Sequence, residues 1–379
     1  MRVSRRSAVD PFIVMDVMEA ARQEEAKGRR IIHMEVGQPA TAAPQAARTA
    51  LADAMAAGPL GYTVALGLPE LRAGIAQLYG QWYDIDLDPE RVVVTAGSSA
   101  GFLLAFTALF DAGDKVGLAA PGYPSYRQIL SALSLKPVAI EGQAAHGFQP
   151  QPSDMAGLQG LIAASPANPT GTMLSKAELT ALAQASSDTN CALISDEIYH
   201  GISYGDRAIS ALEVTDDVYV INSFSKYFSM TGWRIGWMVV PPDHVRTVER
   251  LAQNMFICAP HSSQVAALGA LNAHEELQAH LKVYAANRAL LLGGLEKAGL
   301  KVISPADGAF YIYLDVSEWT TDSRDLAQNI LSEAGVAVTP GLDFDAARGH
   351  QTLRLSYARS TADMEEGLAR LTQYFASKG

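Results

Sequence analysis

Apolar residues occur along this chain in two patterns that alternate with one another. Short continuous apolar runs predict buried strands, and longer segments with an apolar residue every three or four positions predict helices. In the middle of the chain the predicted strands are residues 92–94, 116–119, 161–164, 192–195, 218–222 and 235–240, and the predicted helices are residues 98–110, 125–133 and 175–187. Continuous apolar strands separated by helices are typical of an α/β fold, with a mostly parallel central sheet and helices on both faces.

The two ends of the chain show a different arrangement. Near the C-terminus, strands are predicted at residues 309–314 and 352–357, and helices at residues 323–334 and 362–376. At the N-terminus, Asp10 is a candidate helix N-cap, Pro11 suits the first helical position and Gly28 suits the helix end. We therefore expect a large domain over residues 46–275 and a smaller α+β domain formed by both termini, residues 1–45 and 276–379.

Composition narrows the classes of function. The 379 residues, of which 49% are hydrophobic, can bury a sizeable core, and the net charge of -11 argues against nucleic acid or an anionic membrane as a partner. No run of about 18 apolar residues occurs, so no membrane span is predicted. Cys191 and Cys258 show no disulfide or metal-ligand spacing. We interpret them as buried thiols, expect no metal site, and favour a reducing compartment, the cytoplasm.

The candidate chemistry centres on a lysine between two apolar strands. Lys226 follows the strand at residues 218–222, with Ser223, Ser225 and Arg234 close to it in the sequence. An amine at the end of a buried strand loses its proton more easily, so it can act as a nucleophile or a base. Such a lysine beside donors for an anion suits a Schiff base with pyridoxal phosphate. A polar turn with a solvated lysine is the other interpretation of this stretch.

Further polar residues follow the predicted strands, where ligands bind in folds of this kind. Gly97, Ser98 and Ser99 link a strand to a helix and form a candidate phosphate site at the helix N-terminus. Tyr123 offers an aromatic face that could stack on a flat ring, and Asn168 offers a donor in a proline-rich turn. An ordinary strand–helix turn, a packed tyrosine and a structural Asn-Pro turn are the alternatives.

Two charged residues lie in strands where burial is expected. Asp196 ends an apolar strand, and a buried carboxylate needs a partner such as a protonated pyridine nitrogen. Tyr199, which follows it closely, could donate to the hydroxyl of the same ring. Arg354 could bind a substrate carboxylate through two parallel hydrogen bonds. A helix N-cap role for Asp196 and an internal salt bridge for Arg354 are the alternatives.

Together these motifs resemble those of the pyridoxal-phosphate-dependent aminotransferases of class I/II, in the aspartate aminotransferase superfamily of fold type I. The matching segments, in the order of that family, are residues 37–39, 61–62, 97–99, 168–171, 196–199, 223–236, 308–311 and 354–357. The resemblance covers essentially the whole chain. Its most specific part is Ser-x-Ser-Lys followed by Arg-x-Gly, with Asp-Glu-x-Tyr upstream.

The resemblance implies a role for each matching residue. Lys226 is the Schiff-base lysine, and Lys226, Asp196 and Tyr199 are the catalytic residues. The implied cofactor-binding residues are Gly97, Ser98, Ser99, Tyr123, Asn168, Asp196, Tyr199, Ser223, Ser225, Lys226 and Arg234, and Tyr62 reaches the phosphate of the neighbouring subunit in a homodimer with shared active sites. Arg354, Gly37 and Asn168 are the implied substrate-binding residues.

The activity that the resemblance implies is transfer of the amino group of an L-amino acid to a 2-oxo acid, by a ping-pong mechanism through Lys226, in amino acid biosynthesis. A β-elimination (C–S) lyase would use the same Lys226, Asp196 and Arg354, and a non-catalytic ligand-binding regulator is a further alternative. A lyase releases ammonia and pyruvate without an acceptor, whereas an aminotransferase needs a second oxo acid. The apolar loop at residues 256–261 gives a mild preference for a neutral or aromatic substrate.

Overall fold

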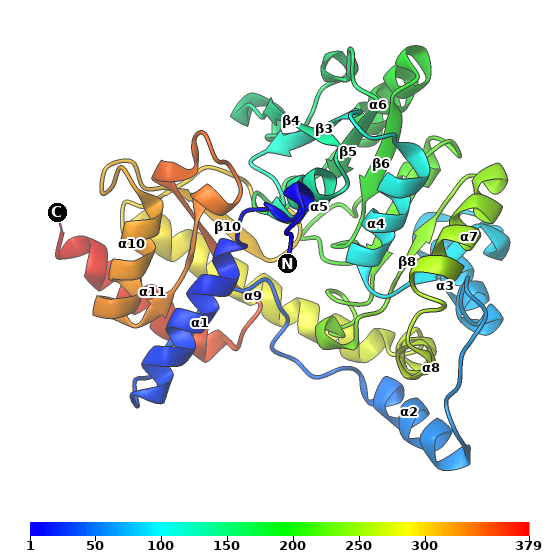
Figure 1. The fold of residues 1–379 in the computed structure, drawn as a ribbon. Coiled ribbons are helices and arrows are strands. Elements are labelled where there is room, and N and C mark those ends of the chain that lie inside the picture. The colour runs from blue at the N-terminus through cyan, green and yellow to red at the C-terminus, as the bar shows by residue number, and fades with distance from the viewer. Residues whose placement is uncertain (379) are drawn as a thin grey trace.

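The computed structural model describes residues 1–378, and a seven-stranded sheet lies at its centre (Figure 1). The strand order is β2-β8-β7-β6-β5-β3-β4. The strands are β2 (Val92–Thr95), β3 (Lys115–Ala120), β4 (Lys136–Glu141), β5 (Gly160–Ala164), β6 (Ala192–Asp196), β7 (Tyr219–Ser223) and β8 (Gly236–Val239). β8 is antiparallel to both of its neighbours, and the other adjacent pairs are parallel. The prediction of a mostly parallel sheet is therefore confirmed.

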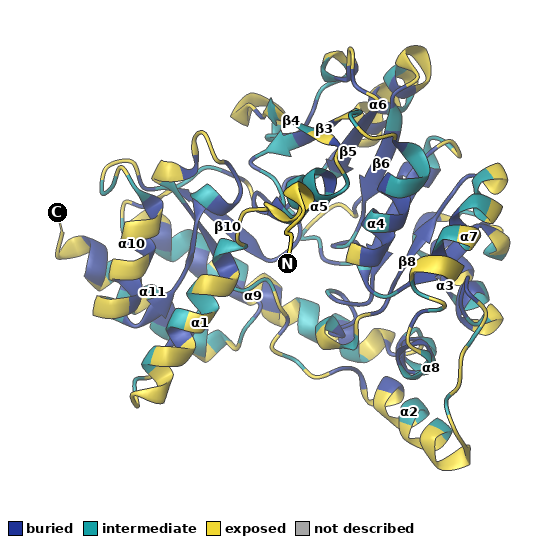
Figure 2. Ribbon diagram, viewed as in Figure 1, coloured by how far each residue is buried: buried dark blue, intermediate teal, exposed yellow. Residues whose placement is uncertain are grey.

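Alternate residues of a strand point to opposite faces of the sheet, and apolar residues cover both faces here. Ile162, Ile194 and Ile221 pack in one apolar cluster, whereas Leu161 and Leu193 pack in another. The helices around the sheet are α2 (Gln45–Ala57), α3 (Pro69–Tyr83), α4 (Ser98–Leu109), α5 (Pro124–Ala132), α6 (Lys176–Thr189), α7 (Val245–Met255) and α8 (His261–Ala270). Figure 2 shows the strands buried and the outer helical surfaces exposed.

Segments from the N-terminal and C-terminal parts of the chain lie together beside this sheet (Figure 1). β1 (Ile32–His33) pairs in parallel with β11 (Val336–Ala337). β12 (Thr339–Pro340), β13 (Thr352–Ser356), β10 (Tyr311–Asp315) and β9 (Lys301–Val302) form an antiparallel sheet in that order. The accompanying helices are α1 (Ile13–Ala26), α9 (His274–Lys297), α10 (Ser323–Asn329) and α11 (Thr361–Ala376). The domain boundaries at residues 45/46 and 275/276 stay a prediction.

The start of α1 differs from the sequence prediction. The helix begins at Ile13, and Phe12 holds the N-cap position without a side-chain hydrogen bond. Asp10 instead accepts a hydrogen bond from the side chain of Gln128 at 3.2 Å. The carboxylate of Asp343 accepts hydrogen bonds from the first two backbone N–H groups of the helix, those of Ile13 and Val14. A residue far away in the sequence therefore takes the capping role that was predicted for Asp10.

Strand β4 was not predicted, because its sequence is not a continuous apolar run. It lies at the edge of the sheet, and exposed and half-buried residues are mixed along it. Residues 31–37 also have the sequence of a short strand, but they pair only over Ile32–His33. Edge strands need less apolar sequence than central ones, so apolar runs alone do not detect them.

Three expectations from composition concern thiols, membranes and metals. Cys191 is a buried free thiol, whereas Cys258 is only partly buried, so the interpretation as buried thiols holds for Cys191 alone. Within residues 1–378, every helix is too short or too polar to cross a bilayer. Over the same residues, no three His, Cys, Asp or Glu side chains are grouped so that they could hold a metal ion.

Candidate active site

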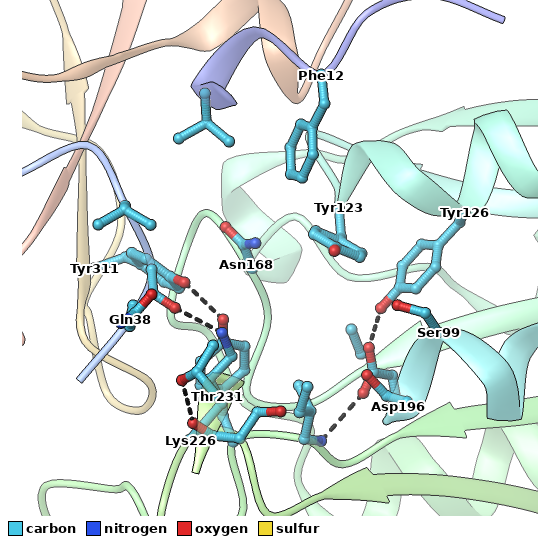
Figure 3. Close-up of a pocket in the computed structure, with 18 of the residues that line it drawn as sticks. Phe12, Gln38, Ser99, Tyr123, Tyr126, Asn168, Asp196, Lys226, Thr231 and Tyr311 are labelled. Carbon is cyan, nitrogen blue, oxygen red and sulfur yellow. Dashed lines mark hydrogen bonds between the residues drawn. The ribbon is translucent and has the colours of Figure 1, made fainter. Parts of the chain in front are cut away.

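A cavity of about 290 Å³ lies at the carboxyl ends of the central strands (Figure 3). The predicted residues that line it are Gly37, Ser98, Ser99, Tyr123, Asn168, Asp196, Tyr199, Ser225, Lys226, Arg234 and Arg354. These residues come from many separate elements, and the fold brings them together around one space. The cavity is therefore the candidate active site.

Lys226 follows β7 and reaches into this cavity. Its Nζ donates a hydrogen bond to the carbonyl oxygen of Gly37 at 2.6 Å. Burial together with the charges of Arg354 and Arg234 lowers the pKa of Lys226 to about 7, and the charge of Asp196 opposes this shift. A large share of the amine is therefore neutral near pH 7, which a nucleophilic or basic lysine requires.

This pKa predicts how the protein without cofactor captures pyridoxal phosphate. Only the neutral amine attacks an aldehyde, so the capture rate is expected to rise with pH around a midpoint of about 7. Stopped-flow absorbance between about pH 6 and pH 9 measures this rate. Nα-acetyl-lysine amide, whose amine has the ordinary pKa of about 10.4, is the control for titration of the cofactor itself. A midpoint shared with this control would contradict the assignment.

Asp196 ends β6 and is the only carboxylate that lines the cavity among the described residues. Its side chain accepts hydrogen bonds from the hydroxyl of Tyr126 and from the backbone N–H of Ile198, the latter at 3.1 Å. Burial raises the pKa of Asp196 to about 6, and these hydrogen bonds and Lys226 oppose the rise. A cationic ring nitrogen beside Asp196 would stabilise its charge further.

An anion site faces the same cavity. Ser98 and Ser99 form the N-terminus of α4, where free N–H groups favour an anion. Arg234 lies against Gly97, and a Cβ atom at Gly97 would come within 2.5 Å of the guanidinium. The positive φ of Gly97, 79°, also favours glycine there. Together these groups form a cradle for a phosphate.

Ser223 lies behind this cradle. Its Oγ donates to the carbonyl oxygen of Ile235 at 3.0 Å and lies 2.8 Å from the Oγ of Ser225, and the residue is buried. Of the two serines, Ser225 lines the cavity. Its carbonyl oxygen accepts a hydrogen bond from Thr231 at 2.7 Å, and Thr231 lines the cavity as well.

Tyr123 and Asn168 line one part of the cavity, which we call the slot (Figure 3). Tyr123 packs edge-on against Phe12 and Tyr126, with ring centroids 5.9 and 5.2 Å apart. On the other side, the hydroxyl of Tyr199 lies 2.6 Å from that of Tyr311. The slot therefore has an aromatic wall and polar groups at its edge, which suit a substituted ring.

Arg354 is buried in β13 at one end of the cavity. Its guanidinium donates to the side-chain oxygen of Asn168 at 2.9 Å, to Thr339 at 3.2 Å and to the carbonyl oxygen of Glu35. It lies 4.3 Å above the ring of Tyr311. Among the described residues its Nε has no partner, and no carboxylate forms an ion pair with it. The alternative of an internal salt bridge is therefore wrong, and a carboxylate ligand would stabilise this cation.

Three predicted residues do not line the cavity: Gly97 and Ser223 lie directly beside residues that do, whereas Tyr62 makes no contribution to it. Its side chain is 83% exposed, in the segment between α2 and α3. Gly37 does line the cavity, where it packs closely against Tyr311. A Cβ atom at position 37 would lie 1.8 Å from the hydroxyl of Tyr311. The contact of Tyr62 with a neighbouring subunit stays a prediction.

Sequence reasoning missed several residues that line the cavity. They are Phe12, Val14, Met15, Met18, Gln38, Tyr126, Ile198, Thr231 and Tyr311 among others. Thr231 and Tyr311 lie inside matched segments, so the motifs could have indicated them. The residues of α1 follow an ordinary apolar helical pattern, which carries no sign of a ligand.

The cavity fits pyridoxal phosphate. It offers a lysine with a lowered pKa, a buried carboxylate for the ring nitrogen, an aromatic wall and a cradle for the phosphate. Arg354 also lines the cavity and forms no ion pair with a carboxylate among the described residues, so a substrate carboxylate would find a cation there. Each group matches one part of the cofactor or of an amino acid substrate.

Comparison with known proteins agrees with this fit. The family profile of aminotransferase class I and II matches residues 29–371. A valine–pyruvate aminotransferase from Mycobacterium tuberculosis is 45% identical, over 100% of this chain and 99% of the relative. An aspartate/prephenate aminotransferase from Thermus thermophilus is 32% identical, over 98% of each chain.

Solved structures agree as well. A Silicibacter pomeroyi protein superposes with a TM-score of 0.95 at 64% identity, and an aminotransferase from Mycobacterium tuberculosis with 0.97 at 45% identity, both over 100% of each chain. The chain belongs to the class I and II aminotransferases. It is a transaminase that uses pyridoxal 5′-phosphate and moves an amino group from an amino acid to a 2-oxo acid.

Proposed function

We propose that this transaminase takes its amino group from an uncharged L-amino acid with a small aliphatic side chain, and that pyruvate or a similar 2-oxo acid accepts it. The observation that carries the proposal is the composition of the cavity wall. The α1 side of the cavity is apolar, and it consists of Phe12, Val14, Met15 and Met18. Burial of an aliphatic side chain against this wall stabilises the bound substrate by about 0.8 kcal/mol for each methylene group.

The cations of the cavity support the same choice. Lys226, Arg234 and Arg354 are the only lysine, arginine or histidine residues that line it among residues 1–378. In our proposal Lys226 meets the cofactor aldehyde, Arg234 meets its phosphate and Arg354 meets the substrate α-carboxylate. A second carboxylate of aspartate would then be buried without a partner, which is costly. The name of the Mycobacterium tuberculosis relative, valine–pyruvate aminotransferase, points to the same substrate class.

Each predicted residue receives a role in this proposal. Asp196 holds the ring nitrogen, Tyr199 and Asn168 contact the ring hydroxyl, and Tyr123 stacks on the ring. Gly97, Ser98, Ser99, Ser223, Ser225 and Arg234 form the phosphate site, all within the large domain of residues 46–275. Arg354, Gly37 and Asn168 orient the amino acid. Bound pyridoxal phosphate supplies an aldehyde carbon for the amino group and a protonated ring that withdraws electrons from Cα.

The chain's own acid–base chemistry centres on Lys226. With a pKa near 7, its amine can accept the proton from the substrate Cα and later return it. Arg354 holds the α-carboxylate meanwhile, so that Cα stays within reach of Nζ. The apolar residues of α1 line one side of the same space. A second oxo acid then takes the amino group by the reverse steps, which is a ping-pong mechanism.

We further propose a homodimer that shares its active sites, with a place in cytoplasmic amino acid biosynthesis. Tyr62 supports the dimer, because it is an exposed aromatic residue close in sequence to two other exposed apolar residues, Val64 in the same segment and Met55 on α2. The imidazole of His261 lies 2.9 Å from the carbonyl oxygen of Gly61, which holds this segment against α8. Exposed apolar side chains that lie close together favour contact with another protein surface.

The substrate class is tested by paired-substrate assays. With pyruvate as acceptor, kcat/KM for L-valine is expected to exceed that for L-aspartate by about 100-fold, because the second carboxylate lacks a cation. Met18→Ala is expected to lower kcat/KM for L-valine several-fold, whereas Val283→Ala, an exposed apolar site on α9, serves as the matched control. Equal rates with valine and aspartate would contradict the proposal. Release of ammonia and pyruvate from L-cysteine without an acceptor would instead support the lyase.

A further inference from the structure

Asp343 is a buried carboxylate that none of the roles above uses. It ends a single helical turn, Gly341–Asp343, that follows β12, and its side chain is 2% exposed. Its Oδ1 accepts the backbone N–H of Ile13 at 3.1 Å, and its Oδ2 accepts that of Val14 at 3.2 Å. Both donors belong to the first turn of α1, where helical N–H groups have no partner within the helix. Asp343 therefore holds the start of α1 through both of its oxygens.

The surroundings of Asp343 act on its charge in two opposite directions. Burial raises the pKa of Asp343, and the two amides, Arg354 and Arg127 oppose the rise. The N-terminus of α1 adds the partial positive charge of a helix end. A neutral side chain of the same size would keep less of this attraction, so Asp343 ties α1 to its segment more strongly than an amide would.

The first turns of α1 form the apolar wall of the active site. The backbone N–H of Val14 donates a hydrogen bond to Asp343, while its side chain lines the cavity. Met15 and Met18 line the cavity beside it. Phe12, just before the helix, packs edge-on against Tyr123 (Figure 3). A shift of α1 would therefore move the whole wall against which a substrate side chain rests.

The same segment is joined to the strand that carries Arg354. β12 pairs with β13 in a register that sets Thr339 opposite Arg354, and Thr339 also accepts a hydrogen bond from the Arg354 guanidinium at 3.2 Å. Asp343 follows β12 directly in the chain. The short segment from Thr339 to Asp343 thus contacts Arg354 at one end and the N-terminus of α1 at the other.

We infer that Asp343 is a positioning residue that fixes α1 at a set distance from Arg354, and thereby sets the size of the amino acid side chain that the active site accepts. The inference deepens the proposed function and rests on it in one respect, the binding of the α-carboxylate by Arg354. Without this anchor, the wall of Val14, Met15 and Met18 moves away from a small side chain. Small substrates then lose contacts, while larger ones find room.

The test compares Asp343→Ala and Asp343→Asn with the wild-type holoenzyme. Asp345→Asn is the matched control, because Asp345 is a buried carboxylate of the same segment that binds Arg348 and nearby backbone amides instead of α1. Hydrogen exchange of the peptide over residues 12–18 is expected to become about tenfold faster in Asp343→Ala, with a smaller change in Asp343→Asn. The control is expected to exchange within about twofold of the wild type.

The second readout is substrate selectivity. The ratio of kcat/KM for L-valine to that for L-phenylalanine is expected to fall about tenfold in Asp343→Ala, chiefly through a higher KM for valine. Asp343→Asn keeps the side-chain volume, so it provides a folded variant if Asp343→Ala does not fold. Unchanged exchange at residues 12–18, or faster exchange with an unchanged selectivity ratio, would overturn the inference. Faster exchange in an enzyme whose wild type does not accept valine would instead refute the proposed substrate class and leave Asp343 as the anchor of α1.

Discussion

Lys226→Ala is expected to lower kcat for amino-group transfer by about 10⁴-fold or more, and to remove the visible absorbance of the lysine-bound cofactor. The reason is that one amine has two tasks. In the proposed function it holds the cofactor aldehyde before the substrate arrives, and it moves the proton at Cα afterwards. Its lowered pKa of about 7 and its place beside Asp196 and Arg354 suit both tasks. Absorbance spectra and steady-state rates of the purified variant measure the two losses separately.

Lys282→Ala is the matched control for this experiment. Lys282 is an exposed lysine on α9, so its removal changes the net charge equally and leaves the cavity intact. The control is expected to keep the absorbance and the rate of the wild type. A Lys226→Ala protein that is folded and still transfers amino groups at an appreciable rate would refute the role of Lys226.

Arg354→Gln is expected to lower kcat/KM for amino acid substrates by about 100- to 1000-fold, mostly through a higher KM. In the folded protein the guanidinium is buried, and its Nε has no partner among the described residues. In the proposed function a substrate carboxylate pairs with this guanidinium, so loss of the guanidinium leaves that carboxylate buried and unpaired. Rates over a range of L-valine concentrations give KM and kcat separately.

Two further variants make the Arg354 result specific. Arg354→Lys keeps the charge but loses the planar pair of donors, so only partial recovery of kcat/KM is expected. Arg288→Gln is the matched control, because Arg288 is a partly buried arginine that binds the carbonyl oxygens of Pro305 and Ala306 away from the cavity. If KM stays unchanged in Arg354→Gln while the cofactor spectrum is normal, another residue binds the α-carboxylate.

The features that the sequence predicted best are those that depend on residues close together in the chain. Pro69 suits a first helical turn and the apolar spacing over residues 69–83 is regular, so this stretch predicts a helix, and it forms α3. Ser175 and Glu178 have the spacing of a capping box at the start of the predicted helix at residues 175–187, and both hydrogen bonds of the box are present in α6. Lys226, Asp196 and Arg234 could be predicted to lie together because each follows or precedes a recognisable strand of one sheet.

The parts that the sequence could not predict depend on contacts between distant segments. The capping of α1 by Asp343 joins residues 330 positions apart, and the local signal of Asp10 and Pro11 was misleading. The apolar wall of the cavity comes from an ordinary helical pattern, and only the docking of α1 shows that Val14 faces the cavity. Tyr126 was likewise read as part of a helix, whereas its hydroxyl binds Asp196.

The central claim is that Lys226 is the lysine that carries the cofactor, and borohydride reduction followed by peptide mapping tests it most directly. Reduction of the holoenzyme fixes the cofactor on whichever amine holds it, and mass spectrometry then locates it in the sequence. We expect one phosphopyridoxyl group per chain, on the peptide that contains Lys226, and its loss when L-valine is added before reduction. A label on a different lysine, or a folded protein that retains no label from bound pyridoxal phosphate, would contradict the account.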